Sequence, residues 1–152
     1  MHIYRLSKTI YSDDLTGTGC LFFPGRWNKL GTRVLYTSEN VSLAILEVLA
    51  NSEAIPKDYC IIIIEVPDGA SMHEVEIKDL PANWNASPYP DEMAQLTEEW
   101  IREGKHLLMK VPSVHSPLDY NMLVNPIHEA AKHMRMVEKI PYFFDVRLKN
   151  ST

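Results

Sequence analysis

The sequence contains few residues of the kinds that hold metals or disulfides. The 152-residue chain has two cysteines, Cys20 and Cys60, and neither stands in a metal-ligand or disulfide spacing. Both lie in apolar runs typical of strands, where a free cysteine behaves as a small hydrophobic side chain. His128 and His133 lack the His-Glu-x-x-His spacing of a zinc site, which favours surface or capping roles. We therefore expect no metal centre.

Positive charge is also scarce. With 15 Lys and Arg residues against 20 Asp and Glu residues, the chain carries a formal net charge of −5 at pH 7. A protein that binds the nucleic-acid backbone usually has a basic surface, so we expect no direct contact with nucleic acid. A nucleotide site remains compatible with this charge, because it needs only a local cation.

Three further absences narrow the class of protein. The longest apolar run, residues 59–64, is far too short to cross a membrane, and no signal peptide is visible. We therefore expect a cytoplasmic protein without membrane contact. No Gly-x-Gly-x-x-Gly follows an expected strand, which argues against a dehydrogenase-type NAD fold. No Gly-x-Ser-x-Gly surrounds Ser113, which argues against a serine hydrolase.

What is present indicates a single domain over residues 1–152. A hydrophobic content of 45% and a charged content of 23% are ordinary for a globular protein. Periodicity and turn residues predict about three helices and six to eight strands, without a regular βαβ repeat. The prediction is an α+β domain with a mixed or antiparallel sheet. The expected helices cover residues 38–50, 91–103 and 126–133, and the expected strands cover 1–6, 33–37, 59–66, 74–80, 106–111, 121–125, 134–139 and 142–148.

For some of these elements, the sequence also predicts burial, helix caps or the direction of a side chain. Residues 59–66 form a continuous β-branched run, which predicts a strand buried on both faces. Ser38 is expected to cap the first helix and Asn125 the third. On the first strand, Arg5 is either a solvated edge residue or an inward-facing cation, and its spacing favours the solvated position.

Glu47 is the most unusual residue in the chain. It is the one charge in a helical run whose two sides are both apolar, so we expect the helix to be covered nearly all round. A buried carboxylate is costly unless it is paired or hydrogen-bonded. A Glu at the edge of the buried face would be the ordinary explanation for an isolated helix. Arg26 and Tyr36, which precede it closely, favour a small-molecule site instead.

Arg26 and Tyr36 each allow two interpretations. Arg26 lies in a loop framed by Gly25 and Gly31, where it can offer a planar fork to a phosphate or carboxylate. It can equally stack on Trp27 or pair with an acidic side chain. Tyr36 is either a core tyrosine with a satisfied hydroxyl or a stacking platform beside the site.

The other end of the expected site lies near Ser113. Pro112 ends a strand and leaves Ser113 at the mouth of a loop, a position that turn and cap residues usually occupy. The segment 81–90, with three prolines and Trp84, is a surface loop long enough to act as a lid.

The order of these residues resembles the RES-domain toxins of bacterial Xre/RES type II toxin–antitoxin systems. The resemblance runs nearly from end to end, although the family often has a glycine where this chain has Pro24. Its fragments are Tyr4-Arg5, Gly-Arg-Trp-Asn at 25–28, Gly31, Tyr36-Thr37, the helix ending in Glu47, Trp100, Val-Pro-Ser at 111–113, Asn-x-Leu-x-Asn-Pro-x-His at 121–128 and Phe-Asp-x-Arg-Leu at 144–148.

This resemblance implies a fold related to ADP-ribosyltransferases and an active site that takes NAD+ as a substrate, not as a cofactor. Such toxins break the bond between nicotinamide and ribose by hydrolysis or phosphorolysis, and some are described as ADP-ribosylating a protein. The implied partner is a cognate antitoxin with a helix-turn-helix DNA-binding domain on a separate chain. A homodimer or a toxin–antitoxin hetero-oligomer is the implied assembly.

The resemblance also assigns residues to the site. Glu47 would stabilise positive charge on the ribose, Arg26 would hold the pyrophosphate, and Tyr36 would pack against nicotinamide or ribose. Ser113 would bond the ligand or orient Glu47. Further positions that match the family and are expected to assist substrate binding are Asn28, Arg5, Asn125, His128 and Arg147.

Three functions are compatible with this assignment. The first is a toxin that degrades NAD+, and the second is an ADP-ribosyltransferase that modifies a specific cellular protein. The third is an inactive binding module that serves only as a partner for a DNA-binding protein. An exposed Glu47 lying away from Arg26 would favour the third.

Overall fold

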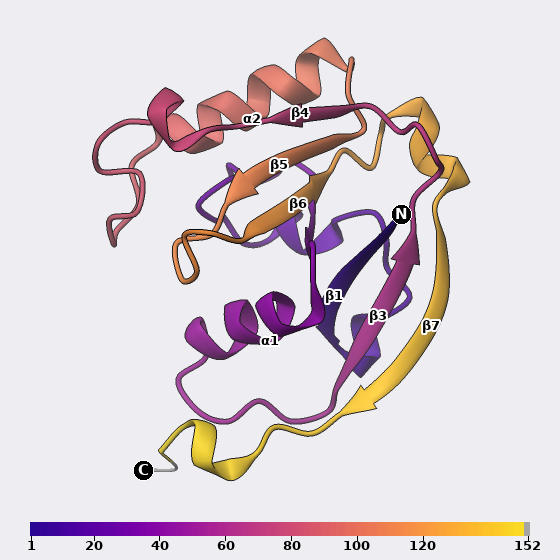
Figure 1. Cartoon of the computed structure of the whole chain (residues 1–152), viewed down its shortest axis with the longest axis vertical. Coiled ribbons are helices and arrows are strands. Elements are labelled where there is room, and N and C mark those ends of the chain that lie inside the picture. The colour runs from indigo at the N-terminus through magenta and orange to yellow at the C-terminus, as the bar shows by residue number, and fades with distance from the viewer. Residues whose placement is uncertain (151–152) are drawn as a thin grey trace.

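The computed structural model describes residues 1–150 as one mixed sheet with two α-helices (Figure 1). The seven strands lie in the order β4-β5-β6-β2-β1-β3-β7, and only β4 and β5 are parallel. The strands are β1 His2–Lys8, β2 Leu35–Ser38, β3 Tyr59–Glu65, β4 Met72–Glu74, β5 Leu108–Pro112, β6 Tyr120–Val124 and β7 Arg135–Tyr142. The α-helices are α1 Val41–Ala50 and α2 Glu92–Glu103. The predicted α+β class and mixed sheet are therefore confirmed.

The sheet opens where β1 meets β2. These strands share a single register pair, Tyr4 with Ser38, whereas β1 pairs with β3 along its whole length. Helix α1 follows β2 directly and packs on β1 (Figure 1). The opening and α1 together make the space in which the candidate site lies.

The hydrophobic core lies on both sides of the sheet. Ile62 and Ile64 of β3 are fully buried against Ile3, while Ile61 lies on the other face with Leu6 and α1. The alternate side chains of β3 are only half-buried. The prediction that β3 is buried on both faces is therefore correct for one face and wrong for the other. The reason is that α1 covers only part of the second face.

Helix α1 begins two residues later than predicted. Asn40, not Ser38, is its N-cap, because the Asn40 side chain accepts a hydrogen bond from the Leu43 amide at 2.8 Å. Ser38 instead ends β2. Leu46 and Ala50 are exposed, so the expectation that the helix is covered nearly all round was wrong.

Helix α2 is close to its predicted span. Asp91 precedes its first residue, and Gly104, with φ of 62°, follows its last. Met93 and Trp100 are buried from this helix, and the Trp100 indole donates to the His106 carbonyl at 2.9 Å. Figure 1 shows α2 beside β4 and β5, away from α1.

Several predicted elements are 3₁₀ turns instead. Cys20 lies in the turn Thr18–Leu21, not in a strand, and the expected third helix is the turn Glu129–His133. One strand, β7, replaces the two expected closing strands, and it is followed by the turn Val146–Leu148. The expected strand 74–80 is mostly the loop and turn after β4. Within residues 1–150, no helix is long and apolar enough to cross a membrane.

Candidate functional site

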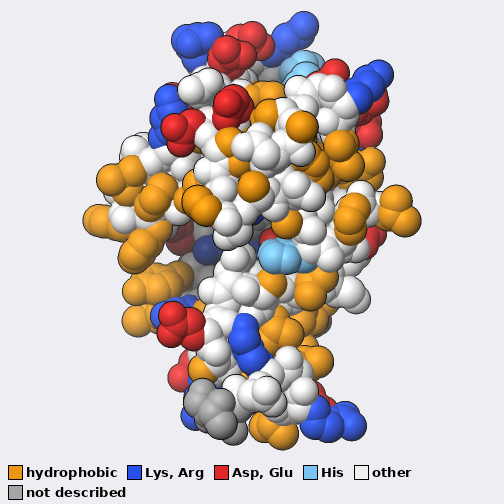
Figure 2. Space-filling model, turned by 90° about the vertical axis from the view of Figure 1, so that its left-hand side faces the viewer, with side chains coloured by type: hydrophobic (Ala, Val, Ile, Leu, Met, Phe, Trp, Pro, Cys, Tyr) orange, Lys and Arg blue, Asp and Glu red, His pale blue; other side chains and the backbone are white. Residues whose placement is uncertain are grey.

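A cleft of about 590 Å³ lies at the opening between β1 and β2. In Figure 2 the surface is hollowed near a histidine, and basic side chains lie at the bottom of the hollow. Its walls come from β1, the loop 24–27, the end of β2, α1, Tyr89 and the loop after β5. Segments that are far apart in the sequence therefore meet around one space.

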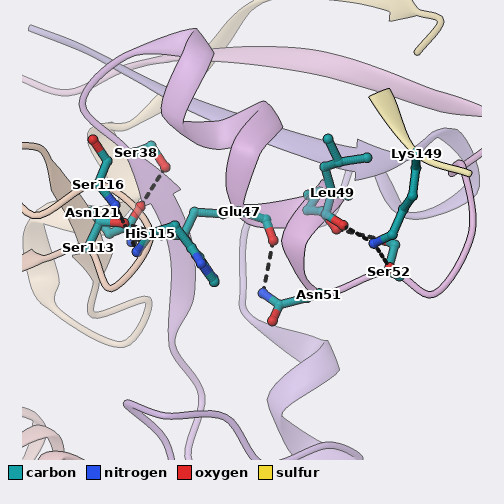
Figure 3. A network of polar contacts seen from close by, with 11 residues as sticks. Ser38, Glu47, Leu49, Asn51, Ser52, Ser113, His115, Ser116, Asn121 and Lys149 are labelled. Carbon is teal, nitrogen blue, oxygen red and sulfur yellow. Dashed lines mark hydrogen bonds and ion pairs between the residues drawn. The ribbon is translucent and has the colours of Figure 1, made fainter. Parts of the chain in front are cut away.

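Glu47 reaches this cleft from α1 and is fixed there by two hydrogen bonds. Its Oε1 accepts from Ser113 Oγ at 2.7 Å and from Asn121 Nδ2 at 2.8 Å (Figure 3). Its side chain is 24% exposed, so the carboxylate is neither in the core nor on the open surface. Two donors on one oxygen compensate the partial burial of the charge.

Ser113 orients Glu47 and also organises its own loop. The side chain is fully buried, and its hydroxyl donates a hydrogen bond to Glu47 Oε1. The same oxygen accepts from the backbone amides of His115 at 3.1 Å and Ser116 at 3.2 Å. Of the two roles expected for Ser113, the structure therefore shows the one in which it positions Glu47.

Asn121 is a site residue to which the sequence assigned no role. It lies opposite Ser38 across β2 and β6, and Ser38 Oγ donates to its Oδ1 at 2.7 Å. This bond leaves the amide nitrogen directed at Glu47. Two signals were present in the sequence: a polar residue within an otherwise apolar strand, and its place at the start of the Asn-x-Leu-x-Asn-Pro-x-His motif.

His115 is the second residue that was missed. Its Nε2 lies 3.9 Å from Glu47 Oε2, and its side chain is 34% exposed at the edge of the cleft. A histidine in a polar loop gives no pattern from which this placement could have been predicted.

Arg26 lines the cleft and also holds the loop 81–90 against it. Its Nη1 donates to the carbonyl oxygens of Trp84 at 2.8 Å and Ala86 at 2.9 Å, and its guanidinium lies 5.3 Å from the centre of the Tyr89 ring. Burial lowers the pKa of Arg26, and the nearby Glu47 carboxylate opposes that shift. One alternative interpretation had Arg26 stacked on Trp27, but the guanidinium lies over Tyr89 instead.

Tyr36 lines the cleft with a hydroxyl that is already bonded. The hydroxyl donates to Asn28 Oδ1 at 2.6 Å, and burial raises the pKa of Tyr36 well above its usual value. Gly25 packs against this pair so closely that a Cβ there would lie 2.7 Å from Asn28 Oδ1. Asn28 is 2% exposed and does not line the cleft, so its expected contact with substrate is replaced by support of Tyr36.

Arg5 faces inward, which corrects the expectation of a solvated position. It lines the cleft from β1, and its Nη1 donates to the Asp14 carbonyl at 2.8 Å. Burial lowers the pKa of Arg5, while Asp14 opposes that shift. The cleft therefore carries two arginines.

The other three expected binding residues lie outside the cleft. Asn125 is buried and accepts from the Ile127 amide, so it shapes the turn after β6. His128 caps the turn Glu129–His133 by accepting from the Ala130 amide. Arg147 is exposed and bonded to Asp145. None of the three lines the cleft, and each makes a local structural contact instead, so their expected part in substrate binding stays a prediction.

The geometry brings one fixed carboxylate, two arginines and an aromatic side chain to a single cleft. The carboxylate can stabilise a developing positive charge, and the guanidinium groups can bind phosphate oxygens. The site does not have the pair of carboxyl groups that most glycosidases use, because Glu47 is the one acidic residue in its lining.

Comparison with known proteins places this chain in a family. The model of the RES domain matches residues 2–145. Three relatives cover nearly the whole chain. The "Prs ADP-ribosylating toxin" of Sphingobium sp. (strain YBL2) is 32% identical, with 93% of this chain and 91% of the relative covered. The "Toxin Res" of Photorhabdus laumondii is 30% identical over 97% of both chains, and that of Yersinia enterocolitica is 31% identical over 98% and 100%.

A solved structure shares the fold. The crystal structure of the M. tuberculosis MbcT–MbcA toxin–antitoxin complex matches with a TM-score of 0.70 and 17% identity, over 93% of this chain and 84% of that chain. The arrangement of strands and helices is thus that of a chain in this complex. The chain belongs to the RES-domain family, as the sequence motifs predicted, and the relatives named above are toxins of that family.

Proposed function

We propose that this chain is the toxin of a toxin–antitoxin pair and that it degrades NAD+ by cleaving the nicotinamide–ribose bond. The observation that carries the proposal is the Glu47 carboxylate, held at the cleft by Ser113 and Asn121 within the field of Arg26. This arrangement suits a reaction in which positive charge develops on a sugar while a phosphate group anchors the substrate.

The cleavage step follows from the charges of the substrate. Nicotinamide is a cationic pyridinium in NAD+ and leaves as a neutral molecule, so no acid is needed to protonate it. The ribose becomes oxocarbenium-like, as in glycoside cleavage. Glu47 Oε2 contacts the ribose hydroxyls and stabilises this charge, while Oε1 stays on its two donors.

The arginines bind the pyrophosphate in this proposal. Arg5 and Arg26 both line the cleft, and a guanidinium can bind phosphate oxygens through two parallel hydrogen bonds. Tyr36 offers its ring to the nicotinamide or ribose, because its hydroxyl is already bonded to Asn28.

A second reaction uses the same site with a different acceptor. In ADP-ribosyl transfer, a protein side chain replaces water or phosphate at the ribose carbon. The observation that favours it is the 32% identity with the Sphingobium protein named as a Prs ADP-ribosylating toxin. The acceptor would approach over the loops 81–90 and 113–117, which border the cleft.

We further propose that the partner is an antitoxin with a helix-turn-helix DNA-binding domain, in a homodimeric toxin or a larger hetero-oligomer. The fold shared with a protein in a toxin–antitoxin complex supports a partner of this kind. The cleft opens at the surface, so a segment of the antitoxin can block it.

The test is NAD+ consumption by the purified, antitoxin-free protein with and without phosphate. We expect loss of NAD+ and release of nicotinamide. ADP-ribose alone would indicate hydrolysis, and a phosphorylated ADP-ribose in phosphate buffer would indicate phosphorolysis. A folded protein that leaves NAD+ intact would contradict NAD+ degradation and favour transfer to a protein.

A further inference from the structure

The two oxygens of the Glu47 carboxylate have different surroundings. Oε1 accepts from Ser113 and Asn121, at 2.7 and 2.8 Å. Oε2 has His115 Nε2 as its neighbour at 3.9 Å. Both Glu47 and His115 line the cleft, so the gap between them opens into the space that the proposed function assigns to the substrate.

The gap between Oε2 and Nε2 fits one oxygen atom. A separation of 3.9 Å is too long for a hydrogen bond between the two groups. An oxygen placed off the line between them can lie about 2.8 Å from both, the usual length of such a bond. A water molecule held there can donate one proton to His115 and the other to Glu47, with its lone pairs free for the cleft, whereas an alcohol has a single proton, which it directs at His115.

We propose that His115 is the general base for the acceptor in this reaction. The proposal rests on the proposed NAD+ cleavage and adds the step that consumes the ribosyl group. The acceptor class is a neutral hydroxyl compound, either water or an alcohol side chain, because such a weak nucleophile must lose its proton to a base as its oxygen bonds the ribose carbon.

The step balances without a further reactant. The bond between the ribose carbon and nicotinamide breaks, and its electron pair goes to the pyridinium nitrogen. The acceptor oxygen forms the new bond to the ribose carbon, and its proton passes to Nε2 of the neutral imidazole. His115 then returns the proton to solvent, to which its side chain is open.

The loop that carries His115 is held in place for this role. Ser113 Oγ accepts from the backbone amides of His115 and Ser116, and the Ser113 amide donates to the Asp119 carbonyl at 3.1 Å. Ser116 Oγ donates to the Asp119 carboxylate at 2.5 Å. Ser113 therefore contacts both the Glu47 carboxylate and the backbone of His115, and so places the two residues side by side at the cleft (Figure 3).

The test compares the wild-type chain with His115→Ala and His115→Gln, using nicotinamide release from NAD+. His133→Ala, an exposed histidine in another turn, is the matched control. Each protein is assayed with and without sodium azide, an anionic nucleophile that needs no base. Glu47→Gln is assayed in the same way, because azide cannot replace a group that stabilises the ribosyl cation.

We expect His115→Ala and His115→Gln to release nicotinamide about 100-fold more slowly than the wild type, as is usual for loss of a general base. Azide should raise the rate of nicotinamide release by His115→Ala to within about threefold of the wild-type rate. The product, seen by mass spectrometry, should be ADP-ribosyl azide. Azide should not restore Glu47→Gln, and His133→Ala should behave like the wild type.

Three outcomes would overturn the inference in different ways. Full activity of His115→Ala would remove His115 from the reaction and leave the proposed function intact. If His115→Ala released nicotinamide slowly and azide did not raise that rate, His115 would act on Glu47 and not on the acceptor. Absence of nicotinamide release by the wild type itself would contradict the proposed function, and the role of His115 with it.

Discussion

At the residue scale, the site depends on how one carboxylate is held. The sequence could identify Glu47, because a charge in an apolar helical run needs a reason to be there. It could not identify Asn121 or His115, since their roles come from contacts across a sheet and a loop that no local pattern encodes. Arg5 was placed wrongly because the spacing of a strand does not reveal which face meets a cleft.

Asn121 gives the first prediction at this scale. Asn121→Asp replaces a hydrogen-bond donor on Glu47 Oε1 by a second carboxylate. We expect kcat for nicotinamide release to fall about 10- to 100-fold, because a bond to a charged group contributes about 1.5–3 kcal/mol. The KM for NAD+ should change less than about threefold.

The control is Asn51→Asp, which adds the same charge to the cleft wall at a residue whose amide donates to the Glu47 main-chain carbonyl and not to its carboxylate. If Asn121→Asp raised KM and left kcat unchanged, Asn121 would bind substrate and not position Glu47.

Asp14 gives a prediction about pH. Burial alone would raise the pKa of Asp14, but hydrogen bonds from Thr16 and Thr18 outweigh it and lower the pKa from 3.8 to about 2. Because the folded-state pKa is depressed, the stabilisation is complete above the ordinary value and is lost as the pH falls through about 2. After allowance for solvent screening, it contributes about 1 kcal/mol near neutral pH.

Urea unfolding of Asp14→Asn and wild type checks this prediction. The variant should be less stable by about 1 kcal/mol near neutral pH, and the difference should shrink at the acid end. Asp79→Asn, at an exposed position, is the control. A difference that stayed constant with pH would mean that the Asp14 charge is not its source.

At the scale of elements, α1 is the part that aims Glu47 at the cleft. Its N-terminus is set by Asn40 and its C-terminus by the Lys149 ammonium, which donates to the Leu49 and Ser52 carbonyls. The sequence predicted the helix but placed its cap at Ser38, because serine and asparagine are both good caps. Because β2 extends to Ser38, that residue is part of the strand, and Asn40 is the residue left to cap the helix.

The cap at Asn40 is testable by substitution. Asn40→Ala removes the side-chain acceptor of the Leu43 amide and should lower the free energy of unfolding by about 1 kcal/mol. Ser42→Ala, an exposed change in the first turn of α1, should have little effect. If urea unfolding showed that both substitutions lower the free energy of unfolding equally, the Asn40 cap bond would not be the source of the stabilisation.

At the scale of the whole molecule, the prediction was better for elements than for their arrangement. Helix 91–103 was predicted correctly because its apolar periodicity is strong, and the strand at 59–66 because its run of β-branched residues is continuous. The opening between β1 and β2 could not be predicted, since it depends on a single register pair. Chain segments around Asn125, His128 and Arg147 match the family in sequence but lie outside the cleft, which shows that a motif can mark the fold and not the site.

The central claim is that the fixed Glu47 carboxylate breaks the nicotinamide–ribose bond, and its most direct test is the rate of nicotinamide release by Glu47→Gln. The variant should retain its fold and lose about 10²- to 10³-fold in kcat, as for a positioned electrostatic stabiliser. Glu53→Gln, at an exposed position just after α1, should match the wild type. Release at the wild-type rate by Glu47→Gln would contradict the account.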